Sequence, residues 1–211
     1  MLVRGLKPLT FLLCSLPFLW CMYEIVLISQ GQAHSLGADP GKEIVLFNGG
    51  WTIRMLILTL LVTPLKSLFN LGALVRVRRM LGLFTFFYAS LHLASYTVFL
   101  LELEFANIFE DLVKRPYIAV GFTAYLSLIP LAATSNRWMI HRLKKRWKKL
   151  HRVIYVISVL AVIHLIWLTK SDYTDAVIYG GLVALLLGYR MYGSSWLPRN
   201  FLIPRGNKGP V

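Results

Sequence analysis

The sequence predicts an all-α protein: a membrane-embedded bundle of six transmembrane helices with both termini in the cytoplasm. Composition is the first reason, since the 211 residues are 57% hydrophobic and have a mean hydropathy of +0.62. Charged residues make up only 15% of the chain, whereas soluble domains contain about 25%. The second reason is that the apolar residues gather in six runs close to the about 20 residues that a helical span needs. The runs are 9–29, 51–68, 80–103, 116–134, 150–169 and 174–192.

The runs and their connections suit one domain over residues 1–211. The first run resembles a signal-peptide core, but it is long and no Ala-x-Ala site follows, so we expect a retained helix. The second contains Pro64, which kinks or ends a helix. The fourth opens on Pro116, a residue that suits the first helical position. Between the runs we expect polar or charged loops, with a partly amphipathic acidic connection at 104–115.

The charges give the orientation, and this is the third reason. The N-terminus, the 69–79 and 135–149 connections and the tail all fall on one side and hold most of the Lys and Arg. The opposite side holds nearly all of the acids. Lys and Arg mark cytoplasmic loops. The net charge of +14 therefore reflects membrane topology and contact with membrane lipid, and we expect no nucleic-acid partner.

Two histidines lie deep within apolar runs. His92 is twelve residues into the third run and His164 fourteen into the fifth, counted from the same side. At about 1.5 Å per residue, their depths agree within a few ångströms. Ionisable groups at such depth usually face the bundle interior and mark function. Two imidazoles at one depth predict a haem iron with two axial histidines, because no Asp, Glu or Cys stands beside them to complete a zinc or di-iron site. The alternative is that each histidine only bonds a neighbouring helix.

Other charged and imidazole groups lie nearer the surfaces. His151 is about 220° around the helix from His164, so a second haem stays open and would need another ligand. Arg78 and Arg79 lie at the depth of His151 and suit haem propionates or a flavin phosphate, although topology alone also explains them. At the outer side, Arg54 has two readings: an ion pair with Glu24 at matching depth, or an anchor for a haem propionate.

Together these residues resemble a known family. The third-run SLHLASY and the segment KRWKKLHRVIYVISVLAVIHLIW are similar to the ferric-reductase-type transmembrane domain. The outer-loop GADP, the second-run LLVTPL and the RVRRMLGL before the third run resemble, more closely, the MsrQ (YedZ) family. The resemblance covers nearly the whole chain, with the two terminal regions matching least.

The resemblance implies a haem-binding subunit of the bacterial inner membrane, with one haem b or two and, in some members, FMN. It implies His92, His151 and His164 as axial ligands of the haem iron. It also implies electron delivery to a periplasmic molybdenum-containing methionine-sulfoxide reductase, MsrP, in support of repairing oxidised periplasmic proteins. The chain has no G-x-G-x-x-G fingerprint for a nicotinamide cofactor, so we expect the quinone pool or a soluble flavin reductase as donor. Such a redox subunit has no substrate-converting site of its own.

A different class of protein also fits the buried histidines. A small membrane transporter or assembly factor would use His92 and His164 as proton or substrate groups. A split haem band in the reduced-minus-oxidised spectrum of the purified protein separates the two readings.

Overall fold

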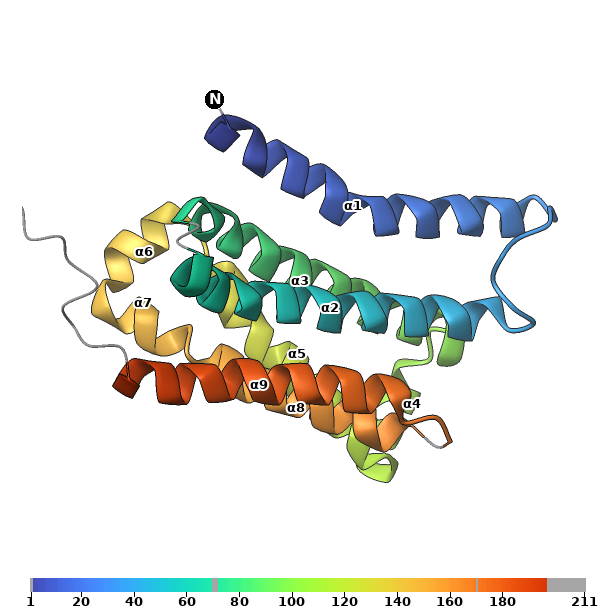
Figure 1. The fold of residues 1–211 in the computed structure, drawn as a ribbon. Coiled ribbons are helices and arrows are strands. Elements are labelled where there is room, and N and C mark those ends of the chain that lie inside the picture. Colours follow the sequence, from blue (N-terminus) through green and yellow to red (C-terminus); the bar gives the residue numbers. More distant parts are fainter. Residues whose placement is uncertain (1, 70–71, 170, 197–211) are drawn as a thin grey trace, which may run out of the picture.

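The computed structural model describes residues 2–69, 72–169 and 171–196, and these form an all-helical bundle (Figure 1). Six helices are long, and short helical segments connect them. The long helices are α1 (Leu2–Ser29), α2 (Pro40–Phe69), α3 (Val75–Ser95), α5 (Pro116–Ala133), α8 (Val153–Leu168) and α9 (Thr174–Trp196). The short segments are η1 (Gly72–Leu74), η2 (Tyr96–Leu100), α4 (Phe105–Lys114), α6 (Arg137–Leu143) and α7 (Lys145–Leu150).

Five helical segments of the described chain are long and apolar enough to cross a membrane. They are Gly5–Ser29, Pro40–Phe69, Gly72–Leu100, Pro116–Ala133 and Lys145–Leu168. The sixth long helix, α9, carries Asp175 and Arg190 and is not among the five. The predicted all-α membrane bundle is thus confirmed, while the sixth span and the orientation stay predictions.

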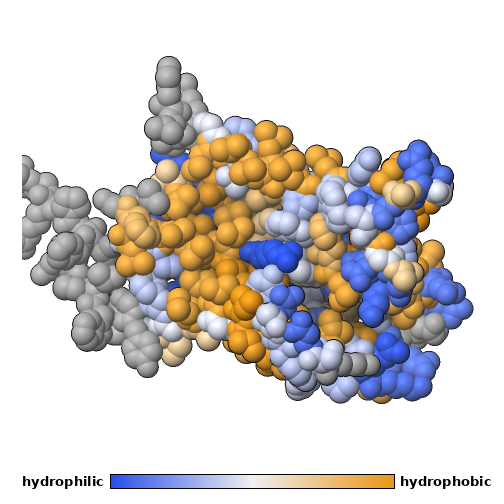
Figure 2. Space-filling view, turned by 45° about the vertical axis from the view of Figure 1, so that its right-hand side comes forward, coloured by the Kyte–Doolittle hydropathy of each residue, from blue (hydrophilic) through white to orange (hydrophobic). Residues whose placement is uncertain are grey.

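The core sits where α2 packs on α3, α5 packs on α8, and α9 lies against α2 and α8. Its most buried side chains include Leu56, Leu60 and Ile157. Outward-facing side chains are also apolar, for example Leu12, Val177 and Leu185. Figure 2 shows a broad apolar belt, with hydrophilic residues gathered mostly at one end. An apolar exterior of this extent suits a bundle surrounded by lipid.

In two places a local cap extends helical structure beyond the runs that hydropathy predicts. α2 begins at Pro40 rather than at residue 51, since the Asp39 side chain accepts a hydrogen bond from Lys42 N at 3.1 Å and caps the helix. Pro40 then occupies the first helical position. The basic 135–149 connection, expected as a loop, is mostly helical: Asn136 caps α6 through Met139 N at 2.7 Å, and Lys144, with φ +47°, separates α6 from α7.

The third run is a helix in two parts. α3 passes directly into the π-helical segment η2, and positive φ angles at Glu102 and Leu103 end it. The acidic connection that follows, expected as a loop, is the helix α4. Asp111 of α4 accepts a hydrogen bond from the Tyr96 hydroxyl. It also forms an ion pair with Arg115, whose Nε lies 3.2 Å from Asp111 Oδ1. The Asp111 carboxylate raises the pKa of Arg115 by charge attraction.

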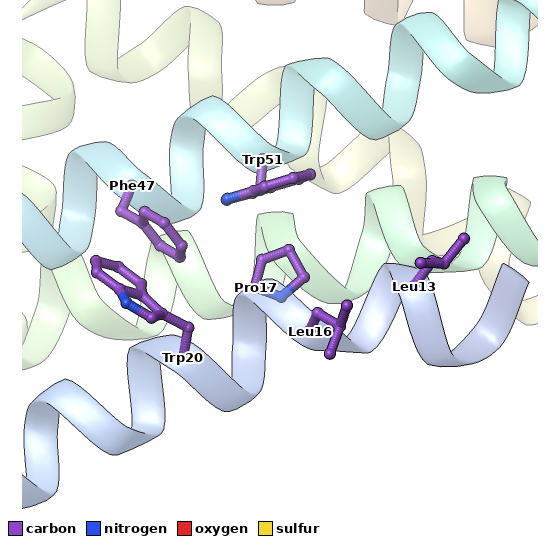
Figure 3. Close-up of a pocket in the computed structure, with 6 residues that line it drawn as sticks. All are labelled: Leu13, Leu16, Pro17, Trp20, Phe47 and Trp51. Atoms are coloured by element: carbon purple, nitrogen blue, oxygen red, sulfur yellow. The ribbon is translucent and has the colours of Figure 1, made fainter. Parts of the chain in front are cut away.

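Prolines shape two of the long helices without ending them. α2 continues through Pro64 to Phe69. α1 contains Pro17 and is visibly bent part-way along its length (Figure 1). Tyr88 of α3 inserts its hydroxyl beside this bend, where it accepts from Phe18 N at 3.2 Å and donates to Cys14 O at 2.6 Å. Pro17 also lines an apolar cleft of about 400 Å³ between α1 and α2, in which Trp20, Phe47 and Trp51 gather (Figure 3).

Candidate cofactor site

The structure brings His92 of α3 and His164 of α8 together inside the bundle. Their ring centroids lie 6.3 Å apart and their planes make an angle of 78°. Both side chains are partly buried. The equal depth predicted from the sequence therefore corresponds to a direct meeting of the two imidazoles.

Each of these rings is oriented by a backbone carbonyl of another helix. His92 Nδ1 lies 2.8 Å from Val45 O of α2, and His164 Nδ1 lies 2.6 Å from Tyr117 O of α5. A carbonyl oxygen only accepts, so Nδ1 carries the proton in each ring and Nε2 keeps its lone pair. Metal-binding histidines are commonly oriented by a bond of this kind. The contact to a neighbouring helix and the ligand role are therefore compatible in the same side chain.

Two glycines give the rings their space. A Cβ built on Gly49 of α2 would lie 3.1 Å from two atoms of the His92 ring. A Cβ on Gly121 of α5 would lie 2.7 Å from His164 Nδ1 and 2.8 Å from its Cε1. Contacts this short are incompatible with any larger residue unless the histidine moves. The pair is thus enclosed by backbone on two sides.

These residues fit a haem iron better than a metal ion held by protein ligands alone. With metal–nitrogen bonds of about 2 Å, two imidazoles on one iron have centroids roughly 6 Å apart, close to the observed 6.3 Å. Neither Nε2 has a hydrogen-bond partner in the described part of the chain. Over the same residues, no group of three or more His, Cys, Asp or Glu side chains is placed to hold a metal. Two axial imidazoles with a porphyrin supplying the other ligands match this donor set.

His151 lies apart from this pair, after the end of α7. Its ring stacks on Trp147 with centroids 3.9 Å apart. Its Nδ1 is 3.1 Å from Trp147 O, and its Nε2 is 3.5 Å from the Ser135 hydroxyl. The described rings in contact with it include no second histidine. The ligand role of His151 stays a prediction.

The three predicted arginines take different positions. Arg78 is partly buried and interacts with the Tyr155 hydroxyl, whereas Arg79 is exposed. Arg54 is exposed; its Nε donates to the Tyr179 hydroxyl at 3.0 Å, and its guanidinium lies 5.1 Å over the Trp51 ring.

The predicted ion pair between Glu24 and Arg54 is wrong. The buried Glu24 carboxylate instead accepts from Ser35 N at 2.9 Å and from the Ser35 hydroxyl at 2.8 Å. The chain between α1 and α2 folds back and supplies these donors locally, so Glu24 needs no distant cation. The other two histidines, His34 and His141, both lie on the surface.

Comparison with known proteins identifies the family. Residues 48–162 match the model of the ferric reductase like transmembrane component. The protein-methionine-sulfoxide reductase heme-binding subunit MsrQ of Xanthomonas campestris pv. campestris (strain B100) is 51% identical over 163 residues, which cover 77% of this chain and 75% of that protein. The chain belongs to the MsrQ family. The MsrQ of Polaromonas naphthalenivorans (strain CJ2) is 42% identical over 189 residues, or 88% of this chain and 84% of that protein. The predicted resemblance is therefore confirmed.

Sequence reasoning missed several residues that shape the site. Gly49 and Gly121 were not singled out, although a glycine inside an apolar run often marks close approach of another group. The carbonyls of Val45 and Tyr117 gave no signal, because every residue carries one. Arg190 was counted only as a tail charge, yet its side chain turns into the bundle. A lone arginine in an otherwise apolar run was the available signal.

Proposed function

We propose that this chain is the haem b electron-transfer subunit of an inner-membrane system that reduces a periplasmic MsrP-like methionine-sulfoxide reductase. The pairing of His92 with His164 carries the proposal. The relatives, which are heme-binding subunits of protein-methionine-sulfoxide reductase, support it independently. The electrons come from the quinone pool or a soluble flavin reductase, and the partner carries out repair of oxidised periplasmic proteins.

When bound, the haem supplies a one-electron redox centre, and the chain sets its properties. His92 and His164 would hold the iron, and their bonds to Val45 O and Tyr117 O fix the tautomer and would increase ligand basicity. The apolar bundle around the rings excludes water and lowers the local dielectric, which also tunes the potential.

The remaining assignments belong to the same proposal. His151 serves as the ligand of a second haem or as a hydrogen-bonding neighbour near the cytoplasmic surface. Arg54 anchors a propionate at the periplasmic side, and Arg78 and Arg79 serve propionates or the phosphate of FMN at the cytoplasmic side. Six spans, with both termini in the cytoplasm, place the two arginine groups on opposite sides of the membrane. One transmembrane domain, 1–211, performs the whole task.

Haem spectra of purified variants test the central pairing. His92→Ala and His164→Ala should each lower haem content, measured as pyridine haemochrome per protein, by at least about fivefold, because one axial bond of the pair is lost. The exposed His34→Ala and His141→Ala are matched controls that should keep full haem. Full occupancy with unchanged spectra in both buried variants would refute the pairing. A preparation of the unchanged protein without any haem band would favour the transporter or assembly-factor reading.

A further inference from the structure

Arg190 of α9 is fixed inside the bundle by α2 and α8. Its Nη2 donates to Leu60 O and to the Thr63 hydroxyl, both at 2.8 Å. The Leu60 carbonyl is available because Pro64, four residues later, has no N–H to bond it. The guanidinium carbon also lies 5.1 Å over the ring of Tyr155. The side chain is therefore held between helices rather than extended into solvent.

The other two guanidinium nitrogens have no such partners. Nε and Nη1 of Arg190 are buried and form no hydrogen bond with any residue that the structure describes. Buried donors of a charged group are normally satisfied, because leaving them unpaired forfeits their hydration without replacement. Two unpaired nitrogens on one anchored guanidinium therefore point to an acceptor that another molecule provides.

A second arginine stands beside this one. Arg78 of α3 interacts with the Tyr155 hydroxyl, and its charge interacts with that of Arg190. Tyr155 thus lies under the Arg190 guanidinium with its ring, and its hydroxyl interacts electrostatically with Arg78. His151 also lies within reach of the Arg78 charge. Two cations of like sign are held together in a partly buried position.

The chain has no acid to balance them. All nine acidic residues occur near the opposite end of the bundle (Figure 1): late in α1, around the start of α2, between η2 and α5, and around the start of α9. The nearest acid along α9 is Asp175, fifteen residues before Arg190 and therefore about 22 Å away along the helix. The nine acids are Glu24, Asp39, Glu43, Glu102, Glu104, Glu110, Asp111, Asp172 and Asp175.

We propose that Arg190, Arg78 and Tyr155 form a binding site for a phosphate group carried by another molecule. Planar guanidinium groups bind phosphate oxygens with both charge and directed hydrogen bonds, and the Tyr155 hydroxyl adds a further donor. The group is either the headgroup of an anionic lipid or the phosphate of a soluble flavin nucleotide. The inference rests on the proposed function for its cytoplasmic location, and it replaces the exposed Arg79 by Arg190 as the partner of Arg78.

Ligand-induced stabilisation tests the site. Thermal unfolding of the purified protein in a neutral detergent would be followed by tryptophan fluorescence with added phosphatidylglycerol, phosphatidylcholine, FMN or inorganic phosphate. A ligand that binds only the folded protein raises its melting temperature with concentration. Stabilisation by phosphatidylglycerol but not phosphatidylcholine identifies a lipid headgroup; stabilisation by FMN and inorganic phosphate identifies the soluble source.

Variants assign the effect to the named residues. Arg190→Gln and Arg78→Gln should each raise the apparent dissociation constant of the stabilising probe at least tenfold. The matched control Arg76→Gln removes the same charge from an exposed position of the same helix, α3, and should bind as the unchanged protein does. Arg78→Gln keeps the test informative if Arg190→Gln fails to fold. No stabilisation by any probe, or equal weakening by Arg76→Gln, would overturn the proposal. Haem content of the same samples reports on the proposed function separately.

Discussion

Each of the two paired histidines is held by a helix that carries no histidine of its own. His92 bonds a carbonyl of α2, and His164 bonds a carbonyl of α5. Four helices therefore define the positions of two rings. Glycine at the facing positions lets the helix backbones approach this closely, since any side chain there would occupy the space of the imidazole.

The glycines provide a graded test at the level of single residues. Gly121→Ala should reduce haem content several-fold, because the new Cβ would lie 2.7 Å from His164 Nδ1 and displace the ring from Tyr117 O. Gly49→Ala should have a smaller effect, since its Cβ would lie 3.1 Å from the His92 ring. Gly181→Ala is the control, because its Cβ would meet nothing within 4 Å. Pyridine haemochrome assays measure all three, and normal haem in Gly121→Ala would contradict the arrangement.

Among the helices, α1 depends on an unusual attachment. The hydroxyl of the fully buried Tyr88 bridges Phe18 N and Cys14 O next to Pro17. In a regular helix these two backbone groups would bond each other. The tyrosine thus both supports the bend in α1 and links the helix to α3.

Removal of this hydroxyl should loosen α1. Tyr88→Phe leaves a backbone donor and acceptor without their partner, and an unsatisfied buried group costs about 1–3 kcal/mol. We expect a lower melting temperature and easier proteolysis of α1 in detergent, with the haem spectrum unchanged because the Tyr88 hydroxyl is bonded to α1 and not to the histidine pair. Tyr23→Phe is a suitable control, since Tyr23 lies on α1 itself and is 60% exposed. Equal stability of the two variants would show that the bridge is dispensable.

The helices could be predicted from the sequence, but most contacts between them could not. Hydropathy predicted the long helices, and counting residues from the membrane surface matched His92 with His164. It also matched Glu24 with Arg54, which do not pair, because depth carries no information on helix rotation or on local donors such as Ser35. The early start of α2 was readable from the Asp39–Pro40 cap. Contacts such as Arg190 with Leu60 O join segments far apart in sequence, and only the packing of α9 on α2 reveals them.

Across the whole molecule, charge separates the two ends of the bundle. Every acid lies near the end where α1 finishes and α2 begins, while the basic α6 and α7 lie at the other end. Such a bias in Lys and Arg sets the orientation of membrane proteins, with the basic end in the cytoplasm. It supports the proposed topology, but the status of α9 as a span decides where the C-terminus lies.

Reporter fusions distinguish the two topologies. A fusion after residue 193 should report a cytoplasmic location if α9 crosses the membrane, and a periplasmic one if only the other five segments do. A fusion in the 31–38 connection should report the periplasm, and one within 135–149 the cytoplasm, in both cases. These two internal fusions are the controls, because they depend on the charge bias and not on α9. A periplasmic reading after residue 193 would remove the sixth span.

The carbonyl bonds to His92 and His164 also bear on how this protein is made in the cell. Protein contacts alone already define the ring positions, so the bundle can be inserted and folded before any iron arrives. Biogenesis then separates into translocon insertion followed by cofactor loading. We expect cells unable to synthesise haem to accumulate the intact apoprotein, and the purified apoprotein to acquire the haem spectrum when hemin is added in detergent. Degradation of the chain in those cells, with no recoverable apoprotein, would instead mean that the cofactor is needed during folding, as it is for zinc fingers that are unfolded without metal.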